Sequence, residues 1–316
     1  MENSALRHVI EAQQFDLDFM ERMFEEADKL RRQVESRNCS DILNTSRELQ
    51  GKGMFALFYE PSTRTRFSFV DAAQRLGMRV CWTENAKEFS SAIKGETLED
   101  TIRVLCEYFP DVIVMRHHET GAAERAAKVS SVPIINAGDG KGQHPTQALL
   151  DIYTIKQCLG RVDDITVMMV GDLANGRTVR SLAYLLAKYK NVRIIFSSPE
   201  ELAMKDDILQ YLERKNVVVE VVNYFWPNYE DIDVIYETRI QKERGSTISE
   251  EEAKRFSLTP EKVKGLKPST IIMHPLPRND EVPTEIDSNP QAKYFRQAGN
   301  GMFIRMALLK WVLHSL

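Results

Sequence analysis

The chain has 316 residues, of which 43% are hydrophobic and 28% are charged, as in an ordinary globular protein. Its 42 lysines and arginines against 46 aspartates and glutamates give a net charge of -4, which excludes a bulk attraction for nucleic acid or anionic lipid. No stretch approaches the roughly 20 apolar residues that cross a bilayer. The length predicts two domains, and any bound anion must be held by a local cluster of cations.

The four cysteines stand far apart and include no C-x-x-C pair. They are Cys39, Cys81, Cys106 and Cys158. This density is too low for a disulfide scaffold, which indicates a reducing compartment. The first residues show neither an apolar signal core nor an Arg/Ser-rich transit segment. We therefore expect a cytoplasmic protein, or a plastid protein if a transit peptide has been removed.

Apolar side chains recur every three or four positions in residues 17–30, which predicts an amphipathic packing helix. From residue 54 onward, short apolar runs of strand length alternate with helical stretches. The runs are 54–59, 111–115, 132–135, 165–170, 192–196, 217–222, 231–236 and 270–273. Such alternation is typical of parallel sheets with helices on both faces. The sequence thus predicts an α/β fold with two doubly wound parallel-sheet domains joined by long helices.

Two helical segments set the expected domain boundaries. Residues 144–159 predict a helix that ends at Gly160, just before a new strand. Residues 294–316 are dense in apolar side chains and predict a buried terminal helix. We expect one domain at 1–146, with the helix 294–316 packed back onto it, and a second domain at 147–293.

Ligands of open α/β sheets bind outside the carboxyl ends of the strands, so the residues after each apolar run form the candidate site. The first run is followed by Ser62, Thr63, Arg64 and Thr65, inside which a helical pattern begins. Free backbone N–H groups at a helix N-terminus, hydroxyls and a guanidinium form a phosphate site. The alternative is a Ser/Thr helix cap beside a solvated arginine pair.

Donors and acceptors follow the next two runs. Arg116 and His144 can donate to an oxygen, while the side-chain oxygen of Gln147 can accept from N–H, so the set suits a polar carbonyl and amide. Because His117 and His118 are adjacent, a metal site at these two histidines is an alternative interpretation. Neighbours in sequence rarely point together, and no carboxylate or cysteine stands at ligand spacing, so we expect no metal site.

Residues 171–178, after the fourth run, differ by one residue from the phosphate-binding loop G-x-x-x-x-G-K-[ST], with Arg177 in the lysine position. A nucleoside triphosphatase is therefore one interpretation. A planar guanidinium does not replace the compact ammonium of that lysine, and only Asp231 or Asp233 offers a magnesium carboxylate at a strand end. A bidentate guanidinium fits a carboxylate at least as well as a phosphate.

Two later runs also end in residues suited to a small polar ligand. Arg239 and Gln241 alternate like strand residues that face one side, so both can reach one ligand. Pro275 and Leu276 lie in a His-Pro-Leu-Pro stretch that its prolines hold extended, with carbonyls free to accept from an amine or amide. A rigid exit loop is the alternative for that stretch.

Four motifs occur in order and span nearly the whole chain. They are Phe-Tyr-Glu-Pro-Ser-Thr-Arg-Thr-Arg at 58–66, Lys-Gly-Glu-Thr at 94–97, His-Pro-Thr-Gln at 144–147 and His-Pro-Leu-Pro-Arg at 274–278. Together they resemble the aspartate/ornithine carbamoyltransferases. The two histidine motifs resemble the aspartate branch, since ornithine enzymes typically carry cysteine in those places, and residues 172–190 look most like plant-type and some bacterial members.

The resemblance implies transfer of a carbamoyl group from carbamoyl phosphate to the amine of L-aspartate, in pyrimidine synthesis and without a cofactor. The residues it assigns to carbamoyl phosphate are Ser62, Thr63, Arg64, Thr65, Arg116, His144, Gln147, Pro275 and Leu276. Those it assigns to aspartate are Lys94, Arg177, Arg239 and Gln241. The implied catalytic residues are Arg64, Thr65, Lys94, Arg116 and His144.

In this family Ser90 and Lys94 lie on a loop that enters the site of a neighbouring subunit, so the resemblance implies a homotrimer with shared active sites. Regulatory chains and nucleotide effectors such as UMP or CTP also occur around the family. Three positions depart from its pattern, namely Ile93, Glu237 and Gly245. Glu237 either weakens aspartate binding by like-charge repulsion or, facing away by strand alternation, leaves it unchanged.

Three functions stay open on the sequence. The first is an active carbamoyltransferase for aspartate, with another amino acid such as ornithine as the alternative substrate. The second is a nucleoside triphosphatase built on residues 171–178. The third is a catalytically silent carbamoyltransferase-like subunit that binds a ligand or a partner enzyme, against which the retained cationic side chains argue.

Overall fold

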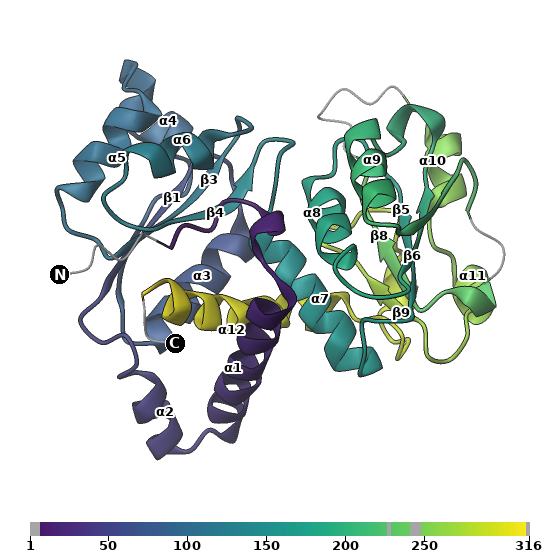
Figure 1. Cartoon of the computed structure of the whole chain (residues 1–316), viewed down its shortest axis with the longest axis horizontal. Helices are drawn as coiled ribbons and strands as arrows, with labels where there is room; N and C mark the ends of the chain where they lie inside the picture. The colour runs from purple at the N-terminus through teal and green to yellow at the C-terminus, as the bar shows by residue number, and fades with distance from the viewer. Residues whose placement is uncertain (1–6, 226–228, 241–247, 314–316) are drawn as a thin grey trace. The chain divides into compact units, whose positions relative to one another are not determined.

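The computed structural model describes residues 7–225, 229–240 and 248–313. Contacts divide the chain into two units, the first made of Met1–Thr146 with Gly301–Leu316 and the second of Gln147–Asn300. Both divisions fall inside helices, α7 (Pro145–Leu159) and α12 (Tyr294–Val312). The chain therefore passes between the units within two long helices, and the predicted fold class is confirmed (Figure 1).

The sheet of the first unit has four parallel strands in the order β2-β1-β3-β4. Their bounds are β1 Gly53–Phe58, β2 Arg79–Trp82, β3 Val112–His117 and β4 Ile134–Asp139. Helices α5 (Leu98–Cys106) and α6 (Ala122–Val129) cover one face, and α3 (Thr63–Arg75) covers the other (Figure 1). Strands β1 and β3 confirm predicted runs. β4 overlaps the run predicted at 132–135 but continues to Asp139, and β2 was not predicted.

The remaining helices of this unit are η1 (Ala12–Gln14), α1 (Leu17–Ser36), α2 (Cys39–Thr45), α4 (Ala86–Phe89) and η2 (Ser91–Lys94). The predicted packing helix is α1, which starts where the Asp16 carboxylate accepts from the N–H of Phe19 at 2.7 Å. The last turns of α12 pack against it. There Lys310, only 2% exposed, pairs with Glu26 at 2.5 Å and Glu48 at 3.1 Å.

The sheet of the second unit has five parallel strands in the order β7-β6-β5-β8-β9, and all five confirm predicted runs. Their bounds are β5 Thr166–Val170, β6 Arg193–Ser197, β7 Val218–Val222, β8 Val234–Glu237 and β9 Ile271–Met273. Helices α8 (Arg177–Leu186) and α9 (Asp206–Arg214) lie on one side, and α10 (Glu250–Phe256) and α11 (Pro260–Lys264) on the other (Figure 1). Short 3₁₀ turns complete the unit at η3 (Glu200–Leu202), η4 (Tyr229–Asp231) and η6 (Thr284–Ile286).

Each sheet has one point at which the strand order reverses. In the first it lies between β1 and β3, and in the second between β5 and β8. Chain connections leave such a point toward opposite sides, which opens a crevice beyond the carboxyl ends of the two strands. The topology therefore singles out one ligand-binding position in each unit.

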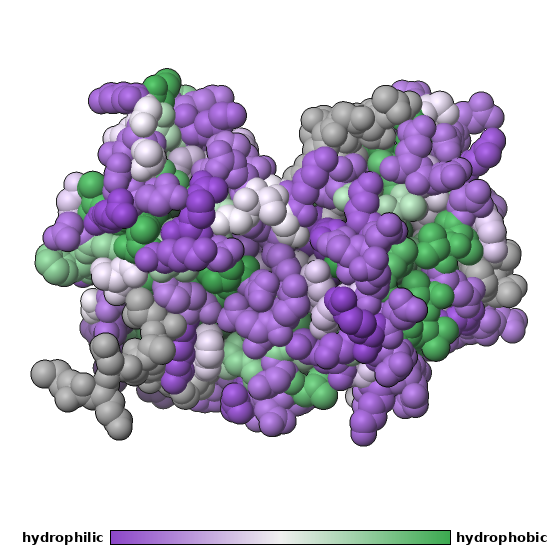
Figure 2. All heavy atoms as spheres, turned by 45° about the horizontal axis from the view of Figure 1, so that its top comes forward, coloured by the Kyte–Doolittle hydropathy of each residue, from purple (hydrophilic) through white to green (hydrophobic). Residues whose placement is uncertain are grey.

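Among the described residues, no helix is both long and apolar enough to span a bilayer. The face in Figure 2 is mainly hydrophilic, with hydrophobic side chains in separate areas. All four cysteines are free thiols.

Candidate functional site

The predicted phosphate-binding residues lie at the N-terminus of α3, directly after β1. Ser62 is the N-cap residue, but its side chain does not cap the helix. Its hydroxyl instead accepts a hydrogen bond from Arg116 Nη1 at 3.3 Å. No side chain caps the first N–H groups of α3, so this helix end can receive an anion beside the hydroxyls of Thr63 and Thr65.

Arg116 joins the two strand ends at the switch point of the first unit. It lies opposite Phe58 in the β1–β3 pair, and its Nε donates to Glu60 Oε2 at 3.1 Å. Arg64 is the second residue of α3 and makes no hydrogen bond or ion pair within the described chain. Partial burial lowers the pKa of its guanidinium. Arg116 and the helix end that carries Arg64 therefore meet at the switch point of the first sheet.

The loop that leads to His144 is held by the carboxylate of Asp139 at the end of β4. This carboxylate accepts from the N–H groups of Gly121 at 2.7 Å and Gln143 at 2.8 Å. His144 itself is 4% exposed, and its Nδ1 lies 3.4 Å from the hydroxyl of Thr146. The ring is thus fixed between β4 and the start of α7, at the same edge of the sheet as Arg116.

His117 and His118 follow one another at the end of β3 and are held by local contacts. The Nδ1 of His117 accepts from the N–H of Glu119 at 3.0 Å, and its ring stacks on that of His118. Burial, reinforced by the neighbouring His118, lowers the pKa of His117 to about 4. Among the residues that the structure describes, no group of three His, Cys, Asp or Glu side chains is placed to hold a metal ion.

The predicted aspartate-binding arginines follow the two strands at the switch point of the second unit. Arg177 is the first residue of α8, after β5, and is 6% exposed. Arg239 follows β8, which ends at Glu237, so the prediction that Arg239 lies on an alternating strand is wrong. Gln241 lies outside the described residues. Because β5 pairs with β8, both arginine-bearing segments start from adjacent strand ends.

The loop from β5 to α8 is not a nucleotide-binding loop. The backbone N–H groups of residue 171 and residues 173–175 already donate within the protein. Two of them share the carbonyl of Leu202, and a third donates to the carboxylate of Asp172 at 3.0 Å. A phosphate cradle requires such N–H groups to be free, so the triphosphatase interpretation is wrong.

The His-Pro-Leu-Pro stretch is ordered by its own histidine. The Nδ1 of His274 accepts from the N–H of Leu276 at 2.8 Å, and its Nε2 lies 3.0 Å from Glu281, which places a proton on Nε2. Leu276 has a φ of 56°, in the left-handed region that leucine rarely adopts. The segment that contains Pro275 therefore has a defined and locally strained backbone.

A buried carboxylate that sequence reasoning missed holds Gln147. Asp151 is fully buried in α7 and accepts from Gln147 Nε2 at 2.9 Å, Gln297 Nε2 at 2.7 Å and the hydroxyl of Tyr236 at 2.8 Å. The available signal was an aspartate between apolar residues of this helix, four residues after a predicted site residue. Asp151 thus receives donors from three different segments of the second unit.

Glu237 is 1% exposed, and neither of its carboxylate oxygens has a hydrogen-bond partner. Burial, with a contribution from the negative charge of Glu281, raises its pKa well above the usual value, against an opposing effect of Lys262. By strand alternation it faces away from Tyr236, its neighbour in β8. Gly245 lies outside the described residues.

Ser90 and Lys94 flank η2. The Ser90 hydroxyl accepts from the N–H of Ala92 at 3.2 Å and thereby caps this short turn. Lys94 is exposed and makes no interaction within the described part of its own chain. Two large apolar side chains nearby, Phe89 and Ile93, are 82% and 70% exposed.

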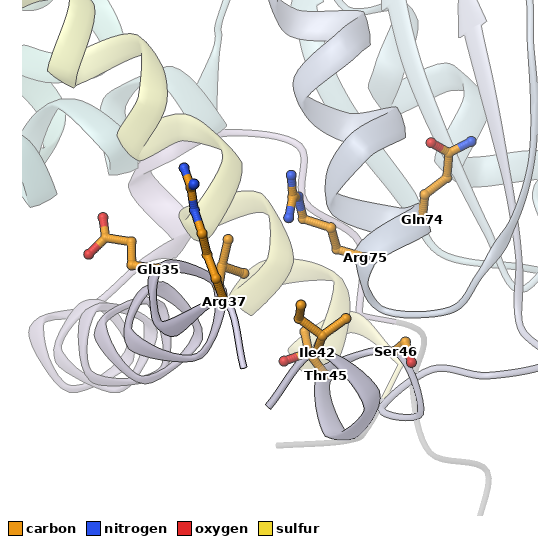
Figure 3. Close-up of a pocket in the computed structure, with 8 residues that line it drawn as sticks. Glu35, Arg37, Ile42, Thr45, Ser46, Gln74 and Arg75 are labelled. Atoms are coloured by element: carbon orange, nitrogen blue, oxygen red, sulfur yellow. The ribbon is translucent and has the colours of Figure 1, made fainter. Parts of the chain in front are cut away.

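A cavity of about 530 Å³ lies elsewhere in the first unit. Figure 3 shows Arg37 and Arg75 beside it, at the ends of α1 and α3. Arg75 is the last residue of α3 and Thr63 the first, so at about 1.5 Å per residue the two ends are roughly 18 Å apart. The cavity is therefore at the opposite end of α3 from the predicted phosphate-binding residues.

Each unit thus gathers cationic and hydrogen-bonding side chains at the switch point of a parallel sheet, which defines a two-domain α/β protein for small anionic ligands. The family model described as "Aspartate/ornithine carbamoyltransferase, carbamoyl-P binding domain" matches residues 7–157. The model described as the "Asp/Orn binding domain" of the same enzymes matches residues 163–312. The chain belongs to the aspartate/ornithine carbamoyltransferase family.

Its relatives include a chloroplastic aspartate carbamoyltransferase of Oryza sativa subsp. japonica, 55% identical over 98% of this chain and 85% of the relative. Among solved structures, aspartate transcarbamoylase from Trypanosoma cruzi in complex with carbamoyl phosphate and aspartate has a TM-score of 0.89 at 39% identity, covering 96% of this chain and 94% of that one. The catalytic subunit of Methanocaldococcus jannaschii aspartate transcarbamoylase has a TM-score of 0.88 at 43% identity, and the match covers 98% of this chain and 99% of that one.

Proposed function

We propose that this chain transfers the carbamoyl group of carbamoyl phosphate to the amine of L-aspartate, giving N-carbamoyl-L-aspartate and phosphate in pyrimidine biosynthesis. The observation that carries the proposal is similarity to aspartate carbamoyltransferases across both domains, at 55% identity over 98% of the chain for the rice enzyme. The Trypanosoma cruzi relative, with the same fold, binds carbamoyl phosphate and aspartate together.

Carbamoyl phosphate binds at the switch point of the first unit. Its phosphate lies at the open end of α3, against Ser62, Thr63, Arg64 and Thr65, where N–H groups and a guanidinium face a dianion. Arg116 and His144 donate to the carbonyl oxygen. The amide group is received by acceptors, which are the side-chain oxygen of Gln147 and the carbonyls of Pro275 and Leu276.

Aspartate binds at the switch point of the second unit. Its two carboxylates are held by Arg177, Arg239 and Gln241, because planar guanidinium groups bind carboxylates in a bidentate manner. Lys94 of a neighbouring subunit completes the cationic set. Glu237 does not compete with these groups, since its carboxyl group is buried and its raised pKa favours the neutral form.

The reaction needs no covalent nucleophile. The neutral amine of aspartate attacks the carbonyl carbon, an N–C bond forms, and the C–O bond to phosphate breaks. Negative charge that develops on the carbonyl oxygen is stabilised by Arg116 and His144, and the departing dianion by Arg64 and the α3 terminus. The leaving phosphate is the proposed acceptor of the amine proton.

A direct assay for N-carbamoyl-L-aspartate tests the proposal. The purified chain is expected to form it from carbamoyl phosphate and L-aspartate, without added metal and without turnover of L-ornithine. Product from ornithine would reassign the substrate. Tight binding of a phosphonate–dicarboxylate bisubstrate mimic without turnover would instead identify a catalytically silent subunit.

The active assembly is a homotrimer. Lys94 is exposed without a partner in the described part of its own chain, and the exposed side chains of Phe89 and Ile93 beside it suit burial against a second subunit. Light scattering is expected to give three times the chain mass, and a monomeric mass with full activity would contradict the shared site. The free thiols suit a reducing compartment, the cytoplasm or a plastid, and the rice relative is chloroplastic.

A further inference from the structure

In the network around Asp151, the direction of each hydrogen bond, from donor to acceptor, bears on substrate recognition. An ionised carboxylate only accepts hydrogen bonds, so each glutamine that contacts it must present its NH₂ group to it and direct its carbonyl oxygen elsewhere. Gln147 and Gln297 both do so, and both use the same oxygen, Oδ1. One buried carboxylate therefore sets the orientation of two side-chain amides.

The oxygen of Gln297 points to the His-Pro-Leu-Pro segment. It accepts the backbone N–H of His274 at 2.9 Å, and His274 in turn accepts the N–H of Leu276 at 2.8 Å. The oxygen of Gln147 has no donor within the part of the chain that the structure describes. The network thus turns the NH₂ group of Gln147 to Asp151, leaves its carbonyl oxygen available to a ligand, and anchors the backbone that carries the other two acceptors.

We propose that Asp151 is a positioning residue that orients the acceptors for the NH₂ group of carbamoyl phosphate, an inference that rests on the proposed function. A carbamoyl NH₂ has two N–H donors and therefore needs acceptors. With its amide reversed, Gln147 presents its own NH₂ to that group, and two donors then face each other. Asp151 excludes this orientation.

Tyr236 completes the network from the other carboxylate oxygen, Oδ2. Burial and the negative charge of Asp151 raise the pKa of Tyr236, so its hydroxyl stays protonated and donates. A fully buried carboxylate is stable only when its oxygens are hydrogen-bonded, and this one has donors on both. The glutamines use Oδ1 and the tyrosine uses Oδ2, and the side chain of Gln147 also interacts with the hydroxyl of Tyr236, so the tyrosine and Asp151 hold the Gln147 amide together.

The test compares carbamoyl phosphate with acetyl phosphate, in which a methyl group replaces the NH₂. D151L removes both acceptors and frees the Gln147 amide. We expect kcat/KM for carbamoyl phosphate to fall about tenfold or more, the scale of one lost hydrogen bond to an oriented group. The inhibition constant of acetyl phosphate is expected to change by less than about threefold, since it has no N–H to recognise.

D151N is the matched control, because an asparagine keeps Oδ1 for both glutamines and turns its NH₂ toward the hydroxyl of Tyr236. It is expected to retain most of the discrimination between the two phosphates. Q297L removes only the hydrogen bonds that link Asp151 to His274. It is expected to give a smaller selective loss of kcat/KM for carbamoyl phosphate, which provides a test if D151L does not fold. Equal losses for both ligands, or unchanged discrimination in D151L and Q297L, would overturn the inference. A wild-type chain that forms no carbamoylaspartate would refute the proposed function instead.

Discussion

Gly171 and Thr238 touch through their backbones at the switch point of the second sheet. Gly171 follows β5 with a φ of +102°, and a Cβ atom on it would lie 2.1 Å from the carbonyl oxygen of Thr238. Thr238 in turn donates its N–H and hydroxyl to the carbonyl of Val170, at 2.9 and 2.7 Å. The segments that begin at these residues carry Arg177 and Arg239, so this contact sets where the two arginines start.

Substitution of Gly171 by alanine is expected to weaken aspartate binding. The new Cβ displaces Thr238 and the adjoining Arg239, while the positive φ alone costs about 1–2 kcal/mol. KM for aspartate should rise with little change in that for carbamoyl phosphate. G160A is the control, since Gly160 has a φ of +74° with open space around its Cβ and pays only the backbone cost. Equal kinetic effects of the two substitutions would contradict the role of the contact.

Substitutions of Arg64 and Arg239 are expected to weaken the binding of different substrates. Arg64→Ala should weaken carbamoyl phosphate, because it removes a guanidinium at the helix end that receives the phosphate. Arg239→Ala should mainly raise the aspartate concentration needed for half-maximal rate. Steady-state kinetics with each substrate varied measures both. If the two variants lose the same substrate, the assignment of one ligand to each unit is wrong.

His144→Ala is expected to reduce kcat by the equivalent of about 2–4 kcal/mol, the scale of a lost donor to a developing oxyanion. His118→Ala serves as the control, because this exposed histidine lies outside the predicted site. An unchanged kcat in the His144 variant would remove the residue from the carbonyl-binding set.

Most strands were predictable because each carries a short apolar run. Eight apolar runs mark eight strands of the structure, each flanked by helical periodicity. β2 was not predicted from the sequence. It is an edge strand that pairs only with β1 and exposes three of its four side chains, at Arg79, Cys81 and Trp82. β7 is also a largely exposed edge strand, but its valines at 217–219, 221 and 222 form an apolar run that the shorter β2 lacks.

The residues of the candidate site also divide into those that local sequence predicts and those that only the packing reveals. Arg64, Arg116 and Arg177 are found from sequence because their position relative to a strand end is a local property. The Asp151 network is not local, since Gln297 lies 146 residues away along the chain. Nothing in either segment alone shows that one carboxylate serves both amides, and only packing of α12 and β8 against α7 brings the donors together.

Lys310→Met is expected to destabilise the first unit by about 3–5 kcal/mol, because it leaves Glu26 and Glu48 buried or half-buried without their cation. Urea unfolding measures the loss. The double variant K310M/E26Q removes one of the stranded charges and should recover part of the stability. Similar midpoints for the wild type and K310M would show that water already screens the cluster.

Glu237→Gln is expected to stabilise the protein increasingly as pH rises. In the folded chain burial raises the pKa of Glu237, so the native state keeps a proton that the unfolded state loses above its ordinary value near 4.5. The wild type therefore loses stability from that pH upward, until the folded pKa is reached, by up to about 1.4 kcal/mol per pH unit. Glutamine keeps the shape of the neutral acid without its titration. The free energies of unfolding of the two proteins should agree at pH 4 and diverge by pH 8, whereas E285Q, at an exposed position, should follow the wild type. Parallel pH profiles for wild type and E237Q would mean that Glu237 ionises normally in the folded chain.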